Sequence, residues 1–340
     1  MHGSQHDIYR LIRKTTLKRA FNLILVWISY YWSRITGNTT HWGKPFSISI
    51  EPTTSCNLRC PECPSGLRSF TRPTGMLEEQ MFRKIIDEVY PTLSYLLFYF
   101  QGEPYLHPKF NSLIRYASNK GIYTATSTNG HYLNESTAEE TVRSGLDRLI
   151  ISVDGTTQEV YERYRIGGFI QKVFDGTRAI VEARRKLQSL TPHLIFQFLV
   201  VKPNEHQVDE IRTIANSLGV DQVVFKSAQV YEYEHGNPLI PENDKYSRYR
   251  IGKDGRYGIK NKLLNHCWKM WHSCVITWDG QVVPCCFDKD ASHPMGNLQN
   301  DSFSAIWNNQ RYRQFRASLF KHRKSIDICK NCTEGTKVWV

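Results

Sequence analysis

The sequence has few of the features that mark membrane-spanning or secreted proteins. Its longest apolar stretch covers residues 20–33, which is fourteen residues, whereas about 18–20 apolar residues are needed to cross a bilayer. The nine cysteines are odd in number and lie in clusters at 56–63, 267–286 and 329–332. Clustered cysteines favour metal binding over a framework of disulfides. We therefore expect a cytoplasmic protein whose cysteines serve metal sites.

Acidic residues are scarce near the amino terminus. Residues 1–45 contain seven Lys and Arg residues but one acidic residue, Asp7, and so carry half of the formal net charge of +12. The rest of the chain lacks the evenly basic surface of a nucleic-acid-binding domain, so no nucleic-acid partner is expected. Two interpretations of the segment stay open. Residues 10–34 form either a helix at the interface of an anionic membrane, in peripheral contact with it, or a helix that packs on the protein.

The middle of the chain alternates short apolar strands with amphipathic helices. Met81, Ile85 and Val89 recur at intervals of four, close to the helical period. Six strands that alternate with helices form a parallel sheet with right-handed crossovers. We therefore expect an α/β fold, a partial (βα)6 TIM-type barrel. The predicted strands lie at residues 47–50, 96–100, 122–127, 148–153, 193–201 and 222–226.

Three cysteines follow the first predicted strand. Cys56, Cys60 and Cys63 lie within eight residues, on a loop just past the carboxyl end of that strand. A structural zinc ion takes four ligands, and no fourth Cys or His stands nearby, so a zinc site would need a distant residue. An iron-sulfur cluster, normally held by four thiolates, would here keep one iron open to an outside ligand. The three thiols thus indicate a reactive metal centre.

The CX3CX2C spacing of these cysteines, at the start of a strand-and-helix chain, resembles that of the radical S-adenosylmethionine (radical SAM) family. The resemblance implies that Cys56, Cys60 and Cys63 hold a [4Fe-4S] cluster whose open iron chelates the amino and carboxyl groups of SAM. Reduction by a flavodoxin or ferredoxin-type electron donor would then cleave SAM to methionine and a 5′-deoxyadenosyl radical.

Polar motifs follow three successive predicted strands, at the ends where parallel α/β folds bind ligands. Each motif alone is compatible with an ordinary turn. Together they resemble the radical SAM positions that contact the amino group, carboxylate and ribose of SAM and line its pocket. The residues are Gln101, Gly102, Glu103 and Pro104 after the second strand, Ser127 and Asn129 after the third, and Ser152 and Asp154 after the fourth.

Two positions near this pocket differ from the family pattern. Gln101 stands where the family usually has Gly, and Glu62 stands where an aromatic residue often packs on adenine. Arg163 and Arg165 resemble a family segment in which an Arg reaches the SAM carboxylate or the substrate, and a solvated helix face is the alternative. Arg165 is therefore a candidate catalytic residue.

The carboxyl-terminal region contains a second set of cysteines around a predicted hairpin at residues 275–283. By sulfur count alone, four thiolates there could hold zinc. The order of the cysteines and of a Gly-Asn-Leu motif resembles the SPASM module of radical SAM enzymes, in its shortened twitch form. The resemblance implies a small iron-sulfur domain in which one auxiliary [4Fe-4S] cluster is held by Cys267, Cys285, Cys329 and Cys332.

Two cysteines of this region, Cys274 and Cys286, are left over. Spare cysteines are by default small buried apolar residues. Cys286 directly follows an expected ligand and is a candidate hydrogen donor to the substrate, and either residue could replace an assigned ligand.

These expectations divide the chain into a basic helical segment (1–45), a radical SAM partial barrel (46–227), a linker or active-site cover (228–262) and a SPASM/twitch domain (263–340). The expected activity is abstraction of a hydrogen atom within a two-electron oxidation. About 45 residues precede the first strand, fewer than the leader-binding domain of many peptide-modifying relatives, so a small-molecule, sugar or lipid-linked substrate is favoured. The alternatives are a peptide or protein maturase and, in another class, a zinc-stabilised basic binding protein.

Overall fold

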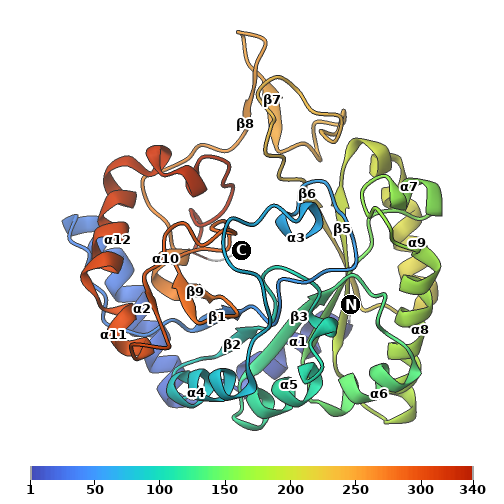
Figure 1. The fold of residues 1–340 in the computed structure, drawn as a ribbon, viewed down its shortest axis with the longest axis horizontal. Coiled ribbons are helices and arrows are strands. Elements are labelled where there is room, and N and C mark those ends of the chain that lie inside the picture. The colour runs from blue at the N-terminus through green and yellow to red at the C-terminus, as the bar shows by residue number, and fades with distance from the viewer. Residues whose placement is uncertain (1, 339–340) are drawn as a thin grey trace.

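The computed structural model describes residues 2–338, with side chains from residue 5, and its centre is a sheet of nine strands (Figure 1). Six strands lie in chain order, and each pairs in parallel with the next. The predicted α/β fold with a parallel sheet is confirmed. The six strands are β1 Ser47–Ile50, β2 Tyr95–Leu97, β3 Tyr123–Thr128, β4 Arg148–Ser152, β5 His193–Val200 and β6 Gln222–Ser227.

Helices join successive strands and form the outer layer of the barrel (Figure 1). Each turns apolar side chains toward the sheet; Ile85 and Val89, expected from their spacing, are buried on one such helix. They pack in one core with strand residues such as Leu96 and Phe196. The helices are α4 Glu79–Val89, α5 Phe110–Asn119, α6 Glu135–Arg143, α7 Gln158–Glu162, α8 Ile170–Lys186 and α9 Val208–Leu218, with the 3-10 turns η1 Pro104–Leu106 and η2 Lys202–Gln207.

The carboxyl-terminal region extends the barrel sheet. Its strand β9 (Ser273–Ile276) pairs in parallel with β1, and β10 (Gln281–Val283) and β11 (Gly296–Asn297) follow in antiparallel order. The hairpin was expected from the sequence, but its pairing with β1 was not, because register between such distant segments leaves no local pattern. The helices of this region are α10 Lys269–His272, α11 Phe303–Trp307 and α12 Gln310–His322, with η3 Arg323–Ser325 and η4 Asp327–Cys329.

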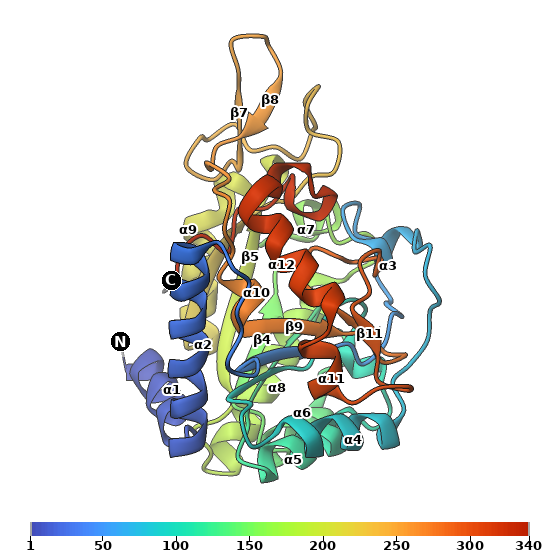
Figure 2. The same ribbon diagram turned by 90° about the vertical axis from the view of Figure 1, so that its left-hand side faces the viewer.

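Residues 228–262 contain a two-stranded ribbon that projects beyond the barrel (Figures 1 and 2). The ribbon consists of β7 (Tyr249–Ile251) and β8 (Tyr257–Ile259). At its base, Tyr249 Oη donates a hydrogen bond to Asn331 Oδ1 at 2.9 Å. Before the ribbon, Tyr231 N donates to Glu62 Oε2 at 2.9 Å. The segment therefore contacts both the loop of the first cysteines and the carboxyl-terminal region.

Two amino-terminal helices, α1 (His2–Arg13) and α2 (Leu17–Thr36), lie at the amino-terminal ends of the strands (Figure 2). Lys14 of the turn after α1 pairs with Asp147, which is buried just before β4. The inner side of α2 packs on the carboxyl-terminal region through Tyr30, whose ring centroid lies 5.4 Å from that of Trp271. The amino-terminal segment thus docks on the protein. Across residues 2–338, no helix combines the length and hydropathy of a bilayer span.

Candidate iron-sulfur and cofactor site

Cys56, Cys60 and Cys63 lie on the loop between β1 and the short helix α3 (Pro64–Leu67). Their side chains line one cavity of about 270 Å³ at the carboxyl ends of the parallel strands. The loop is fixed by its backbone, since Arg59 N donates a hydrogen bond to the carbonyl oxygen of Ile166 at 3.0 Å. The structure therefore brings the three expected ligands to one place.

The arrangement of these thiols fits a cluster that lacks one protein ligand. The three thiols line the same cavity, and among the side chains described, from residue 5 to 338, no three Cys, His, Asp or Glu groups converge on one ion. A zinc ion needs its sulfur ligands at about 2.3 Å from one point, whereas a cluster spreads its ligands over several irons. Burial raises the pKa of Cys56 to about 12 and also raises the pKa of Cys60. Thiolates here require added positive charge, which a bound cluster supplies.

Arg165 places a fixed positive charge at this cavity. Its Nη1 lies 3.8 Å from Cys60 Sγ, and its Nε donates a hydrogen bond to Asp154 Oδ2. Asp154 is completely buried, and burial raises its pKa while Arg165 opposes that rise. Arg165 and Asp154 were both expected near the pocket. Arg165 lines the cavity, whereas Asp154 lies behind it and positions the guanidinium. The side chain of Arg163, by contrast, is 55% exposed and faces solvent.

Gly102 and Glu103 form a tight corner after β2. Gly102 has a φ of +73°, and an added Cβ would collide with the carbonyl oxygen of Thr53, so a side chain is excluded. The buried Glu103 carboxylate accepts hydrogen bonds from Thr128 Oγ1 at 2.7 Å and Asn129 N at 2.8 Å. Glu103 thus joins the ends of β2 and β3, and it also lines the cavity.

Ser127, Asn129 and Ser152 all line the cavity, at the places expected from their positions along β3 and β4. Asn129 Nδ2 donates a hydrogen bond to Asn57 Oδ1 at 2.7 Å and lies 3.9 Å from Cys56 Sγ. The polar end of β3 therefore contacts the cysteine loop directly, and the end of β4 faces the same cavity.

The other two residues of the Gln-Gly-Glu-Pro motif are peripheral. Gln101 is 8% exposed, and its Oε1 lies 3.9 Å from Cys63 Sγ. Pro104 begins η1 and is not among the described residues that line the cavity.

Several residues that line the cavity were missed from the sequence. Tyr99 and Phe100 had been assigned only to a strand, and Gln197 had been given no role. Gln197 is the one polar residue in an otherwise apolar run, at positions 194–200. An isolated polar side chain in a buried strand was therefore a usable signal, whereas two aromatic residues at a strand end carried none.

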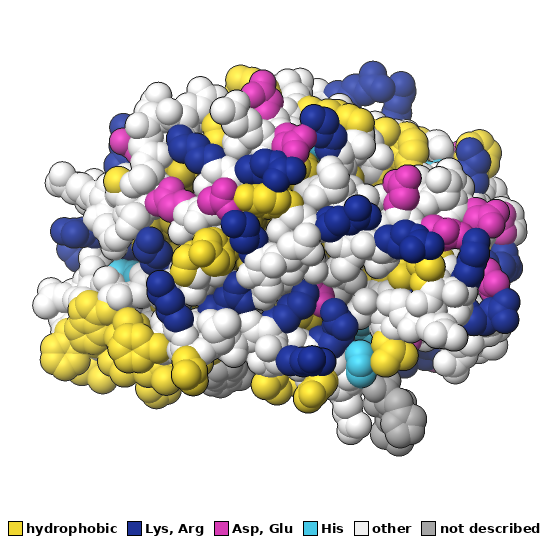
Figure 3. Space-filling view, turned by 90° about the horizontal axis from the view of Figure 1, so that it is seen from below, with side chains coloured by type: hydrophobic (Ala, Val, Ile, Leu, Met, Phe, Trp, Pro, Cys, Tyr) yellow, Lys and Arg dark blue, Asp and Glu magenta, His cyan; other side chains and the backbone are white. Residues whose placement is uncertain are grey.

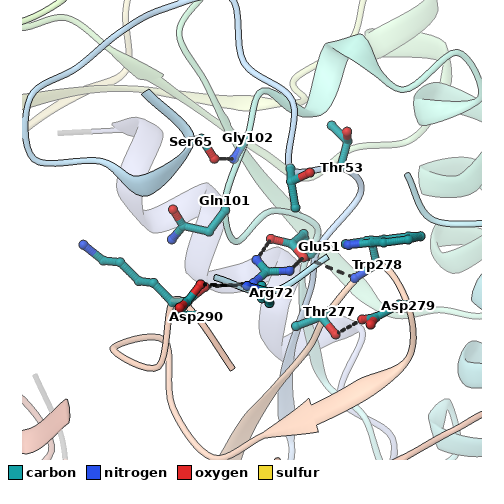
Figure 4. A network of polar contacts seen from close by, with 12 residues as sticks. Glu51, Thr53, Ser65, Arg72, Gln101, Gly102, Thr277, Trp278, Asp279 and Asp290 are labelled. Carbon is teal, nitrogen blue, oxygen red and sulfur yellow. Dashed lines mark hydrogen bonds and ion pairs between the residues drawn. The ribbon is translucent and has the colours of Figure 1, made fainter. Parts of the chain in front are cut away.

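A buried ion pair connects the cysteine loop with the carboxyl-terminal region (Figure 4). Arg72 Nη1 and Nη2 donate to the two carboxylate oxygens of Glu51, at 2.9 and 2.6 Å. Trp278 N donates to the same carboxylate at 3.2 Å, and Arg72 Nε donates to the carbonyl oxygen of Lys289 at 3.0 Å. The pair thus joins the end of β1, the chain beyond the cysteine loop and the β9–β10 turn.

The second set of cysteines gathers in the carboxyl-terminal region. Cys267 and Cys329 belong to one apolar cluster, and the partly buried Cys285 packs against it. Arg323 lies among them, with its Nη2 at 3.5 Å from Cys332 Sγ. Burial raises the pKa of Cys329 to about 12, and Arg323 opposes that rise. A guanidinium beside buried thiols favours the thiolate form that metal ligation requires.

Two family models match the sequence. Residues 50–218 match the radical SAM superfamily, and residues 267–333 match SPASM, an iron-sulfur cluster-binding domain. The chain belongs to the radical SAM superfamily and carries a SPASM domain. The cofactors of this radical SAM protein are therefore a [4Fe-4S] cluster, SAM and auxiliary iron-sulfur. The cavity of the first three cysteines fits a [4Fe-4S] cluster together with SAM. Three thiols without a local fourth ligand leave one iron open, and Arg165 carries a charge opposite to that of the SAM carboxylate.

This radical SAM protein is similar to proteins with different activities. It is 27% identical over 302 residues to the tungsten-containing aldehyde ferredoxin oxidoreductase cofactor-modifying protein of Pyrococcus furiosus, with coverage of 79% of this chain and 82% of that protein. It is 24% identical over 317 residues to the PqqA peptide cyclase of Gluconobacter oxydans, with coverage of 87% and 84%. The structure of Streptococcus suis SuiB bound to S-adenosylmethionine matches with a TM-score of 0.62 and 14% identity, over 86% of this chain and 72% of that one. That structural likeness shows a common fold.

The two remaining cysteines of the radical SAM protein lie in different surroundings. Cys274 is on β9, is 2% exposed and packs in the main core. Cys286 is exposed, and its Sγ lies 3.8 Å from Lys269 Nζ. Neither is among the described residues that line the cavity of the first cysteines. Cys286 directly follows Cys285 in the chain and so lies beside the second set of cysteines.

Proposed function

We propose that this radical SAM protein abstracts a hydrogen atom from a peptide or protein substrate. The observation that carries the proposal is a single cavity that combines three thiols, the Arg165 guanidinium and the polar ends of β3 and β4. When bound there, a [4Fe-4S] cluster and SAM supply a 5′-deoxyadenosyl radical, which removes hydrogen from unactivated C–H bonds. A zinc-stabilised binding protein is not proposed, because the SPASM match is to an iron-sulfur domain.

The residues around the cavity bind and orient the cofactors. Arg165 pairs with the SAM carboxylate, and Asp154 holds the guanidinium in position through a buried hydrogen bond. The segment 228–262 covers the cysteine loop through its contact with Glu62 and helps to exclude water from the reacting groups. The cluster is held by Cys56, Cys60 and Cys63, and SAM contacts come from Gly102, Glu103, Ser127, Asn129 and Ser152, which line the cavity. Gln101 and Pro104 are not proposed as contacts, because they are not among the described residues that line it.

One auxiliary [4Fe-4S] cluster is proposed at Cys267, Cys285, Cys329 and Cys332. Four thiolates close that site to substrate, which leaves electron transfer as the chemistry it can supply. The protein is then an oxidoreductase that removes two electrons from its substrate. Reducing power comes from a flavodoxin or ferredoxin-type donor in the cytoplasm.

The peptide substrate replaces the small-molecule, sugar or lipid-linked substrate that the sequence analysis favoured. The support is the similarity to PqqA peptide cyclase, which extends over 87% of this chain. The cofactor-modifying relative keeps a small molecule as the second candidate, and the substrate experiment below separates the two.

The first experiment tests the cofactor sites. The protein is reconstituted anaerobically, iron and sulfide are counted, and 5′-deoxyadenosine is measured after addition of SAM and a low-potential reductant. About eight irons are expected, and about four should remain in the Cys56→Ala/Cys60→Ala/Cys63→Ala variant, with nucleoside formation abolished. Nucleoside formation by that variant, or no iron in the wild type, would reject the proposal.

The second experiment tests the substrate. Peptides encoded beside the gene are incubated with the reconstituted enzyme, SAM and reductant, and their masses are measured. Loss of two hydrogen atoms, dependent on SAM, is expected for the true substrate. Oxidation of a small molecule with every peptide left unchanged would contradict the peptide assignment without affecting the radical SAM chemistry.

A further inference from the structure

The outward side of α2 is an apolar surface without a partner. Its large apolar side chains follow one side of the helix and have exposed fractions between 40% and 92%. Trp42 extends the surface, with its ring centroid 6.2 Å from that of Trp32. Figure 3 shows hydrophobic side chains gathered at the lower left of the molecule. We call these helical residues the outer face of α2: Leu17, Phe21, Ile24, Trp27, Ile28, Trp32 and Ile35.

The inner side and both ends of α2 are held by contacts with the rest of the protein. Val26 and Tyr30, on its inner side, are completely buried. Thr16 caps the amino-terminal end and Gly37 the carboxyl-terminal end. Arg19 donates hydrogen bonds to backbone carbonyl groups just before β2 and β3. A firmly held helix therefore presents the outer face, whose side chains stay exposed in the described part of the chain.

The exposed charges beside the outer face are positive. Arg13, Lys18 and Arg34 are exposed and form no ion pair with an acidic side chain in the part of the chain that is described. Asp7, the sole acidic residue in positions 1–45, is buried and pairs with Arg148. Anionic lipid headgroups attract such cations, while Trp and aliphatic side chains enter the boundary of the acyl chains. Both properties of the surface match an anionic membrane.

We propose that the outer face of α2 binds the protein peripherally to an anionic phospholipid membrane. This proposal goes beyond the proposed function and does not depend on it. It assigns to the amino-terminal segment both of the roles considered for it, because the inner side of α2 packs on the protein while the outer face meets lipid.

The position of α2 also sets the orientation of the bound enzyme. Asn22 exchanges hydrogen bonds with the backbone of Lys44, just before β1, at 2.8 Å. The helix thus lies at the amino-terminal ends of the strands, whereas the cysteine cavity lies at their carboxyl ends (Figure 2). Membrane binding turns the cavity away from the bilayer. The substrate then arrives from the aqueous side, so the membrane contact gives no reason to expect a lipid-linked substrate.

Vesicle sedimentation of the full-length reconstituted protein tests the proposal. The probes are vesicles of phosphatidylcholine, with and without about one third phosphatidylglycerol. Phe21→Asp/Ile28→Asp should weaken binding to anionic vesicles about tenfold or more, and Lys18→Glu/Arg34→Glu should do so at low salt. Phe169→Asp is the matched control, because Phe169 is 57% exposed but lies just before α8, on the carboxyl-terminal side of β4 and so at the opposite ends of the strands from α2. Iron content and SAM cleavage should be unchanged in every variant.

Three results would overturn the proposal. The wild type could remain in the supernatant with anionic vesicles, or Phe169→Asp could lose as much binding as Phe21→Asp/Ile28→Asp. Alternatively, sedimentation velocity could show a dimer that Phe21→Asp/Ile28→Asp converts to a monomer without any vesicle binding. The outer face would then be an interface between two copies of the chain.

Discussion

Replacement of Arg72 by Met removes one partner of a fully buried ion pair. The side chains of Arg72 and Glu51 are 4% and 0% exposed, and two hydrogen bonds join them. After the substitution, the Glu51 carboxylate keeps one backbone donor, Trp278 N. Removing one partner of such a pair costs about 3–5 kcal/mol, because the remaining charge is buried without compensation. We expect the melting temperature to fall by roughly 5–15 °C.

The loss of stability in Arg72→Met should depend on pH in a defined direction. Burial raises the pKa of Glu51, and Arg72 opposes that rise, so the folded-state pKa of Glu51 should be higher still in Arg72→Met. A carboxyl group with a raised pKa binds protons more tightly in the folded state than in the unfolded state. Stability is therefore lost as the pH rises above the unfolded value of about 4.3. The stability deficit of Arg72→Met should therefore grow as the pH rises above about 4.3.

A double variant provides the control. In Glu51→Gln/Arg72→Met no buried charge remains, so the free energy of unfolding should exceed that of Arg72→Met, and the pH dependence should disappear. Anaerobic thermal melts of reconstituted protein, followed by near-UV circular dichroism, measure both quantities. The reasoning fails if Arg72→Met melts like the wild type or if the double variant is less stable than Arg72→Met.

Three further substitutions test the candidate sites. Arg165→Leu should weaken SAM binding about tenfold or more in equilibrium dialysis, while Arg163→Leu, at an exposed position, should bind normally; equal losses would contradict the assigned role. Gly102→Ala should lower the melting temperature by several degrees, because its φ is +73°, whereas Gly258→Ala, which has open space around it, should not. Cys285→Ser should lose about half of the iron, and Cys286→Ser should keep full iron content; retention of all iron by Cys285→Ser would reassign that ligand.

Features that depend on neighbouring residues were predictable. A short apolar run after a helical segment located β6, predicted at residues 222–226 and observed at Gln222–Ser227. The spacing of Cys56, Cys60 and Cys63 pointed to the family that the domain matches later showed. Ser127, Asn129 and Ser152 were expected at the cavity because the carboxyl ends of parallel strands meet at one edge of the sheet, and they line it.

Features that depend on distant partners were not predictable. Asp154 was expected in the pocket wall, yet its carboxylate is turned away by hydrogen bonds to Arg165 and to the backbone of Leu199. The pair of Glu51 and Arg72 carried no periodic or motif signal. In each case the position of the side chain follows from which donors surround it in three dimensions, and the order of residues along the chain does not record that.

The sequence by itself determined the fold class, the family and the cysteine motifs, because strand alternation, helical period and ligand spacing are local properties of the chain. The tertiary structure alone decided that β9 pairs with β1, so that the SPASM region and the barrel share one sheet. It also decided which side of α2 is buried and which is exposed. The buried side of α2 includes the polar residues Asn22, Ser29 and Ser33, so hydropathy alone does not select it. Packing against Trp271 and its neighbours selects the side that leaves water.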